Sequence, residues 1–462
     1  MFAFITASIA GAATNSKQAE FVGSAKCISC HKEIYAVWKE SRHTKIVQTL
    51  SAESDNVIGY WKGTLKVGAG GAPPGRAGGP AGIPGSGPGP AGMPSATAPP
   101  GLSGTGAGAG RPVGTRIPEA TVRLNRAAPG IYQITLVDSK DPTLEKTYRI
   151  ALTYGGHQDK QRYLIKIGNR HYMAPIAWST ANANWSGYAV ENWYNTDGTL
   201  REPPVEKSFE MACAGCHVTG LELSEDSMGT YEASYTELSV GCERCHGPGS
   251  IHVGSPNKSG AIINPAKLSY ERAMDVCNQC HTSGVSQPGG KLGYPWNDAD
   301  NRPYLVGEIL TKYMVGGSYG NPGTYGKIQA GFWHHWPENG HAAAQVTCFA
   351  CHNPHGGAGN YQLKAPVYDN GLCLSCHGTK FSSLGKIVEH TKHSFSPTIN
   401  GLSRCTSCHS TAASPVSGRF LEIIKPQAAV ASNSCNGCHK EWAGDEAALK
   451  LGAEKYQALF GK

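Results

Sequence analysis

The chain has 462 residues, of which 16% are charged, and it contains 59 glycines and 16 cysteines. This length is enough for two or three ordinary domains, and the glycine content favours a chain rich in loops. The formal net charge is +7. No run beyond the N-terminus approaches the ~18 apolar residues of a membrane-spanning helix, so the pattern excludes such helices there.

Residues 1–19 form the first predicted segment, a leader. Residues 1–13 are apolar and end in small side chains, which is typical of the apolar region and cleavage site of a signal peptide. A positively charged start is missing, so an ordinary apolar N-terminus stays open as the alternative. The leader predicts export, which places the protein in the periplasm or outside the cell.

Eight Cys-x-x-Cys-His motifs use every cysteine of the chain, from 27–31 to 435–439. This pentapeptide is the attachment signal of a c-type haem, in which two thiols bind the porphyrin edge and the histidine binds the iron. A zinc knuckle or a redox dithiol would not place a histidine after every second cysteine. We therefore predict eight covalently attached haem c groups (iron) and no disulfide. Haem propionates would offset the positive charge, so we expect no nucleic-acid partner.

The motifs are numbered first to eighth in chain order. The predicted haem-attaching cysteines are Cys27, Cys30, Cys213, Cys216, Cys242, Cys245, Cys277, Cys280, Cys348, Cys351, Cys373, Cys376, Cys405, Cys408, Cys435 and Cys438. The predicted proximal iron ligands are His31, His217, His246, His281, His352, His377, His409 and His439.

Residues 20–66 form an N-terminal segment that carries the first motif. Apolar residues at helical spacing predict a helix over 33–50. His43 lies twelve residues after His31, which is about 18 Å along a helix axis. We therefore expect His43 to bind an iron other than that of the first motif.

Residues 67–112 form a low-complexity insert, in which Gly and Pro make up 26 of the 45 residues from 68 to 112. It is either a flexible linker or a segment held extended on another surface. Residues 113–200 contain no haem motif. Their strand-like runs, separated by Gly, Pro and Asn, predict a small antiparallel subdomain of four or five strands. These runs are 120–126, 130–139, 146–155, 161–168 and 171–179.

Residues 201–462 form a region that carries the other seven motifs. Short connections rich in Gly, Pro, Ser and Asn predict closely packed haems. A final amphipathic helix is expected over 446–460, with Asp445 as its N-cap.

The chain has 18 histidines, which leaves ten after the eight in the motifs. That supply is enough to give each iron a second imidazole, which predicts closed, six-coordinate haems. The predicted distal ligands are His43, His252, His341, His355, His390, His393, His335 and His157. His334 beside His335, and His171 in the β region with His157, remain alternatives.

The runs GCERCHGPGSIHV, QVTCFACHNPHGG, HTKHSFSP and SNSCNGCH resemble the multihaem c-type cytochromes related to the tetrahaem cytochrome of ammonia oxidisers, and the octahaem cytochromes. The resemblance covers most of 20–440. It implies stacked and perpendicular haem pairs, mostly bis-histidine ligation, export and electron transfer. It matches ligand positions to His252, His341, His355, His390 and His393.

The predicted fold is a multihaem cytochrome c, mostly irregular with short helices wrapped around haems, plus the small antiparallel β subdomain. The predicted function is that of an exported octahaem electron carrier without a catalytic site. Expected partners are redox proteins or extracellular electron acceptors and further copies of the chain, as the subunit of an extracellular filament. The alternative is an octahaem oxidoreductase acting on a small nitrogen or sulfur compound at one open haem.

Overall fold

The computed structural model describes residues 19–68, 119–156, 160–225, 231–256, 260–281, 284–287, 296–316, 340–356, 362–365, 370–381, 384–391, 405–409, 435, 439–442 and 445–461. The Gly/Pro insert and the leader lie outside these residues, apart from Val67, Gly68 and Ala19 at their edges. Among the described residues, no helix is long and apolar enough to cross a membrane.

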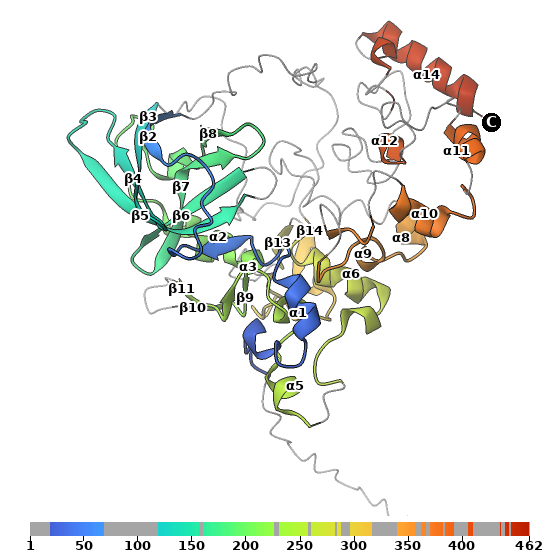
Figure 1. Cartoon of the computed structure of the whole chain (residues 1–462), viewed down its shortest axis with the longest axis horizontal. Coiled ribbons are helices and arrows are strands. Elements are labelled where there is room, and N and C mark those ends of the chain that lie inside the picture. Colours follow the sequence, from blue (N-terminus) through green and yellow to red (C-terminus); the bar gives the residue numbers. More distant parts are fainter. Residues whose placement is uncertain are drawn as a thin grey trace, which may run out of the picture.

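An antiparallel sheet of eight strands forms the largest element. Seven strands follow one another in the order β2-β3-β4-β5-β6-β7-β8, and β1 pairs with β5. Their bounds are β1 Val47–Thr49, β2 Lys62–Val67, β3 Ala120–Ala128, β4 Ile131–Val137, β5 Glu145–Gly155, β6 Lys160–Ile167, β7 Arg170–Ser179 and β8 Asn184–Gly187. The first strand of the meander, β2, also contacts the last, β8. The sheet is therefore curled towards a barrel, on the left of Figure 1.

Aromatic side chains fill the inside of this curled sheet. The indole of Trp61 packs edge-to-face on Tyr163, with ring centres 4.5 Å apart, and Tyr163 and Trp193 are fully buried. Their polar atoms are bonded: the Trp61 Nε1 donates to the Gln133 carbonyl at 3.0 Å. Large aromatic surfaces with satisfied polar groups make a strong core. The sheet is thus held together without haem.

The predicted antiparallel β subdomain is confirmed, and it is larger than expected. The five predicted runs correspond to β3 through β7. β1 and β2 come from the N-terminal segment, for which the first motif and a helix were predicted but no strand, and β8 was not predicted. The alternation of apolar and polar residues identified the long strands, whereas β1 and β8 have too few residues for such an alternation to be recognised.

The predicted helix over 33–50 is wrong in its second half. Helix α1 spans Lys32–Trp38, and Val47–Thr49 form β1 against Leu152–Tyr154 of β5. The Val47 amide donates to the Ser239 Oγ, which itself donates to the Val47 carbonyl. These long-range bonds override the local helical spacing.

Short helices and small strands make up the rest of the described chain, below and to the right of the sheet in Figure 1. The helices are α2 Phe209–Ala212, α3 Ala214–His217, α4 Glu243–His246, α5 Ser250–Gly254, α6 Tyr270–Asn278, α8 Gly340–Ala343, α9 Cys348–Cys351, α10 Gly371–His377, α11 Leu384–Thr391, α12 Thr406–His409 and α14 Glu446–Phe460. The small strands are β9 Val218–Thr219, β10 Glu222–Glu225, β11 Tyr231–Ser234, β12 Glu237–Leu238, β13 Gly284–Ser286 and β14 Met314–Gly316. Single 3-10 turns are η1 Ser24–Lys26, η2 Val190–Asn192, η3 Val205–Lys207, η4 Pro265–Lys267, η5 Leu310–Lys312 and η9 Lys440–Trp442.

The predicted C-terminal helix is confirmed as α14. The Asp445 carboxylate accepts the amide of Ala448 at 2.9 Å, as an N-cap does. Gly452 of this helix packs on the Trp442 side chain. The helix is thereby fixed beside the eighth motif.

Candidate haem-binding sites

The described haem motifs form helical turns. In the first motif the His31 amide donates to the Cys27 carbonyl at 3.0 Å, and the same bond recurs in all the other motifs except the sixth. The sixth motif lies within α10. Residues i, i+3 and i+4 share one face of a helical turn. Two cysteines and the histidine therefore lie on the same side, as attachment of one haem requires.

Five motif histidines face a second histidine across a gap of constant width. The ring centres are 6.0–6.3 Å apart in His31–His252, His43–His281, His246–His355, His341–His377 and His390–His409. A metal–imidazole bond is about 2 Å long, so one ion between two imidazoles separates the ring centres by roughly 6 Å. The spacing fits an iron held between each pair.

Each pair joins two different motifs. His252 follows the third motif and faces His31 of the first, and His355 follows the fifth and faces His246 of the third. His43, just after the first motif, faces His281 of the fourth. The second histidine in these pairs thus lies near one motif and faces another. His252 and His355 follow their own motifs so closely that they could not cross to the far side of the same haem.

The ring planes divide these pairs into two kinds. In His31–His252, His246–His355 and His390–His409, called the parallel pairs, the planes meet at 20°, 9° and 5°. In His43–His281 and His341–His377, called the crossed pairs, they meet at 70° and 89°. The two kinds would present different ligand fields to iron.

Burial favours the neutral form of several of these imidazoles, and the neutral form is the one that binds a metal. Burial lowers the pKa of His43 to about 4, with a further contribution from His281. Burial also lowers the pKa of His341 and of His355. The Nδ1 of His246 donates to the Ile263 carbonyl at 2.8 Å. That bond leaves Nε2 free for a metal and fixes the orientation of the ring.

Apolar side chains beside the first motif remain uncovered by protein. Ile34 and Val37 of α1 are 46% and 52% exposed, and Ile251 and Val253, on either side of His252, are 44% and 41% exposed. Exposed apolar residues gathered at one place indicate a surface that something else covers. A flat apolar porphyrin between His31 and His252 would cover it. The residues present therefore fit c-type haem.

The motifs touch one another in a series. The thiols of Cys27 and Cys242, Cys277 and Cys348, and Cys373 and Cys405 are in hydrogen-bond contact. The Gln279 amide of the fourth motif donates to the Arg244 carbonyl of the third, and His341, just before the fifth motif, faces His377 of the sixth. These contacts give the order first, third, fourth, fifth, sixth, seventh. α1, α6, α9, α10 and α12 accordingly run from the lower middle to the upper right of Figure 1.

The second motif branches from this series and faces the sheet. The Sγ of Cys216 lies 3.8 Å from the Cys280 carbonyl of the fourth motif. His217 meets Tyr154 of β5, with 2.8 Å between Nε2 and Oη. The Arg162 guanidinium lies over the rings of Tyr154 and Tyr188, 5.7 and 4.6 Å from their centres. Burial raises the pKa of Tyr154, so its phenol stays neutral.

Several predicted ligands are not placed with a motif histidine. His171, an alternative ligand, bonds the Glu210 carboxylate at 2.7 Å instead. His439 of the eighth motif stacks on Trp442 at 3.9 Å. His157, His334, His335 and His393 lie outside the described residues, as do Cys438 and the side chain of Cys408. The fourteen cysteines with described side chains are free of disulfides.

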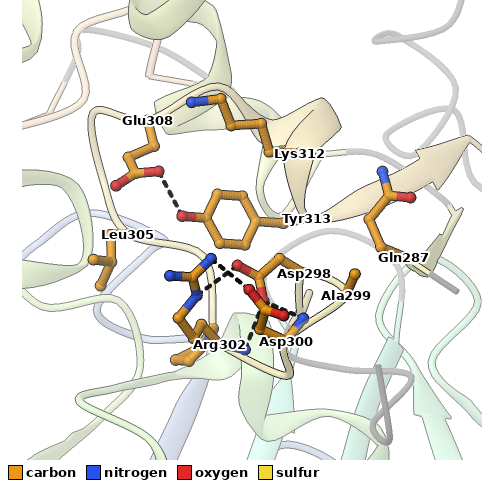
Figure 2. A pocket seen from close by; sticks show the side chains of 10 residues that line it. Gln287, Asp298, Ala299, Asp300, Arg302, Leu305, Glu308, Lys312 and Tyr313 are labelled. Carbon is orange, nitrogen blue, oxygen red and sulfur yellow. Dashed lines mark hydrogen bonds and ion pairs between the residues drawn. The ribbon is translucent and has the colours of Figure 1, made fainter. Parts of the chain in front are cut away.

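A pocket of about 440 Å³ opens elsewhere, lined by Gln287 and by residues between Asp298 and Tyr313. Its charged groups bond one another: the Asp298 carboxylate accepts the amides of Asp300 and Arg302 and the Arg302 Nε, as Figure 2 shows. Beneath it, Trp296 donates to the Gln279 carbonyl at 2.7 Å. These bonds brace the loop behind the fourth motif, and the pocket lies away from the histidine pairs.

Sequence reasoning missed the charged and phenolic residues beside the motifs. Glu243 and Arg244 stand inside the third motif, where the spacing alone drew attention to Cys and His. Tyr154 and Arg162 were part of strand-like runs, and only the register of β5 with β6, which pairs these two residues, brings them together. No signal along the chain links them to His217.

Two family models match parts of the chain. Residues 341–381 match the doubled CXXCH motif, and residues 26–64 and 180–247 match cytochrome c554 and c-prime. The first match contains the fifth and sixth motifs with His341 and His355. The second contains the first three motifs with His43.

Curated relatives are also multihaem proteins. The chain is 25% identical to multiheme cytochrome MtrA of Shewanella baltica over 39% of its length and 55% of the relative. It is 30% identical to cytochrome c-554 of Nitrosomonas europaea over 24% of its length and 49% of the relative. It is 27% identical to the C-type polyheme cytochrome OmcC of Geobacter sulfurreducens over 56% of its length and 34% of the relative. The chain thus spans between a third and just over half of these relatives.

A solved structure shares the fold. The outer cell wall cytochrome OcwA superposes with a TM-score of 0.58 over 95% of this chain and 87% of the other, at 18% identity. Shared motifs and a shared fold point to one group of proteins. The chain is related to the multihaem c-type cytochromes, the group that includes cytochrome c554.

Proposed function

We propose that the chain binds eight c-type haems and conducts electrons along them as an exported cytochrome. When bound, haem supplies iron that takes up and releases single electrons. The observation that carries the proposal is the contact series from the first motif to the seventh, in which a thiol contact, a hydrogen bond or a histidine pair joins neighbouring motifs. Contact between two motifs would bring the haems attached to them close together.

The protein's own contribution is to close and orient each site. A histidine pair would supply two ligands to one iron, which would exclude substrate from it and favour electron transfer over catalysis. Hydrogen bonds such as that from His246 to Ile263 hold the ligand rings in place. The chain around the motifs is proposed to be mostly irregular and wrapped around haem, because haem takes the place of an aliphatic core.

Interrupting the series tests the proposal. Substituting Ser for Cys348 and Cys351 removes the fifth haem, which links the fourth to the sixth. Substituting Ser for Cys213 and Cys216 also removes one haem, at the branch, and serves as the matched control. Haem content is measured by the pyridine haemochrome method, and current is measured through the protein between two electrodes. We expect eight haems in the parent and seven in each variant.

The two variants should differ in current. Loss of the fifth motif's haem should lower it strongly, whereas loss of the second motif's haem should leave most of it. Equal currents in both variants, or a parent with fewer than eight haems, would contradict the proposal. Circular dichroism of the β region checks that both variants fold.

The proposal includes end-to-end self-association into an extracellular filament that meets redox proteins or extracellular acceptors. The first and seventh motifs are the two ends of the contact series among the described residues. A neighbouring copy of the chain could therefore meet one end motif at each end of the series. A head-to-tail contact that does not close produces a fibre. His43 takes no part, because it faces His281 of its own chain. Negative-stain microscopy of protein sheared from cells tests this, and discrete particles at every concentration and pH would contradict it.

A second function is favoured by the site of the second motif. His217 faces the neutral phenol of Tyr154 beside the Arg162 cation, and a neutral phenol is a weak iron ligand. An iron bound there would be open to a small nitrogen or sulfur compound, and the chain would then be an octahaem oxidoreductase. A high-spin ferric signal that shifts with nitrite, hydroxylamine or sulfite, and changes in Tyr154→Phe, would support this function. An entirely low-spin spectrum would exclude it.

A further inference from the structure

The two residues between the cysteines of the third motif carry opposite charges. They are Glu243 and Arg244, and they contact different neighbours. The third motif lies between the first motif on one side and the second and fourth on the other. A charge pair at this place would exert its electrostatic effect on the haems of several neighbouring motifs.

Glu243 lies on the side of the first motif and is 1% exposed. Its carboxylate accepts the amides of Val22 at 2.9 Å, Gly23 at 2.7 Å and Gly249 at 2.7 Å. Hydrogen bonds from backbone amides to a carboxylate are charge-assisted and fix its position. Glu243 is also among the groups that raise the pKa of Cys27 to about 12, after burial and Cys242. Its negative charge is therefore felt at the first motif.

Arg244 lies on the opposite side. Its guanidinium donates to the Gly215 carbonyl of the second motif and lies 3.9 Å from the Cys280 Sγ of the fourth. After burial, Arg244 is the strongest cause of the lowered pKa of His217. Arginine keeps its charge at any physiological pH. Its positive charge is therefore felt at the second and fourth motifs.

We propose that Glu243 lowers the midpoint potential of the haem held by the first motif, and that Arg244 raises the potentials of those held by the second and fourth. Reduction adds one negative charge, which a neighbouring anion opposes and a neighbouring cation favours, and burial strengthens both effects. An electron given up by ferrous iron at the first motif then reduces ferric iron at the fourth or second. This inference rests on the proposed electron-transfer function and adds a direction to it.

The experiment uses the full exported protein with two marked haems. His252→Ala removes the ligand opposite His31, and His43→Ala removes the ligand opposite His281, so each gives one haem a high-spin signal. Glu243→Gln is then compared with its parent in the first background, and Arg244→Gln in the second, by redox titration followed by electron paramagnetic resonance. We expect a positive shift of the marked midpoint for Glu243→Gln and a negative shift for Arg244→Gln.

The two expected midpoint shifts have opposite signs, which distinguishes an effect of charge from an effect of loosened packing. A variant that merely admits water or disturbs a haem would shift both midpoints in one direction, and that result, or no shift, would overturn the inference. Arg244→Lys keeps the positive charge, so its marked midpoint should equal that of the parent. If Glu243→Gln fails to fold, the comparison of Arg244→Gln with Arg244→Lys still tests the inference. Glu222→Gln, on the exposed strand β10, is the surface control and should leave both midpoints unchanged.

A result that refutes the proposed function can be told apart from one that refutes this inference. If neither His252→Ala nor His43→Ala produced a high-spin signal, the ligand pairs would be wrong. The titration of all haems in Arg244→Gln against Arg244→Lys would still test the charge effect. A lower midpoint in Arg244→Gln than in Arg244→Lys would uphold the inference, and identical curves would refute it.

Discussion

Replacing His355 by Ala should open one iron of the eight that the motifs would hold. His355 faces His246 with 6.1 Å between ring centres and 9° between ring planes, so the substitution removes one axial ligand and leaves space for a small molecule. The expected change is one additional carbon monoxide bound per chain and conversion of one eighth of the haem to high spin, since the sequence has eight motifs. Carbon monoxide titration and spin quantification measure both.

The matched control is His171→Gln. His171 is also partly buried, but it bonds Glu210 and faces no motif histidine among the described residues, so this variant should bind no additional carbon monoxide. If His355→Ala bound no more than the parent, or if the control bound as much as His355→Ala, the pairing of His355 with His246 on one iron would be refuted.

Three further predictions concern ligand planes and stability. Perpendicular imidazoles leave the iron π orbitals nearly degenerate, so the two crossed pairs should give low-spin resonances at larger g values than the parallel pairs; their absence from the oxidised spectrum would contradict the geometry. Gly130→Ala places a Cβ 2.3 Å from the Ser51 carbonyl oxygen at a φ of 68° and should cost more than about 1 kcal/mol. Gly168→Ala, at a φ of 60° with no atom within 4 Å, should cost less in the same urea titration. Asp445→Ala should destabilise α14 by about 1 kcal/mol, read from faster amide exchange there, whereas Asp445→Asn should not.

Local chemistry could be predicted from the sequence. The haem motif is a contiguous pentapeptide, so its residues meet on one helical turn whatever the remainder of the chain does. The long strands β3 through β7 were predicted because alternation and turn residues suffice to define them. α14 was predicted with its cap because Asp445 precedes a helical pattern.

Long-range pairing was decided only by the tertiary structure. Spacing indicated that His355 lies too near its own motif, and His43 too far along the expected helix, to bind the iron of that motif, but the fold alone places them opposite His246 and His281. The residues after α1 leave the expected helix because Val47 finds partners in β5 and at Ser239, about a hundred or more positions away. Tyr154 meets His217 for the same reason: the contact depends on how the sheet packs against the second motif, and no local pattern along the chain encodes that packing.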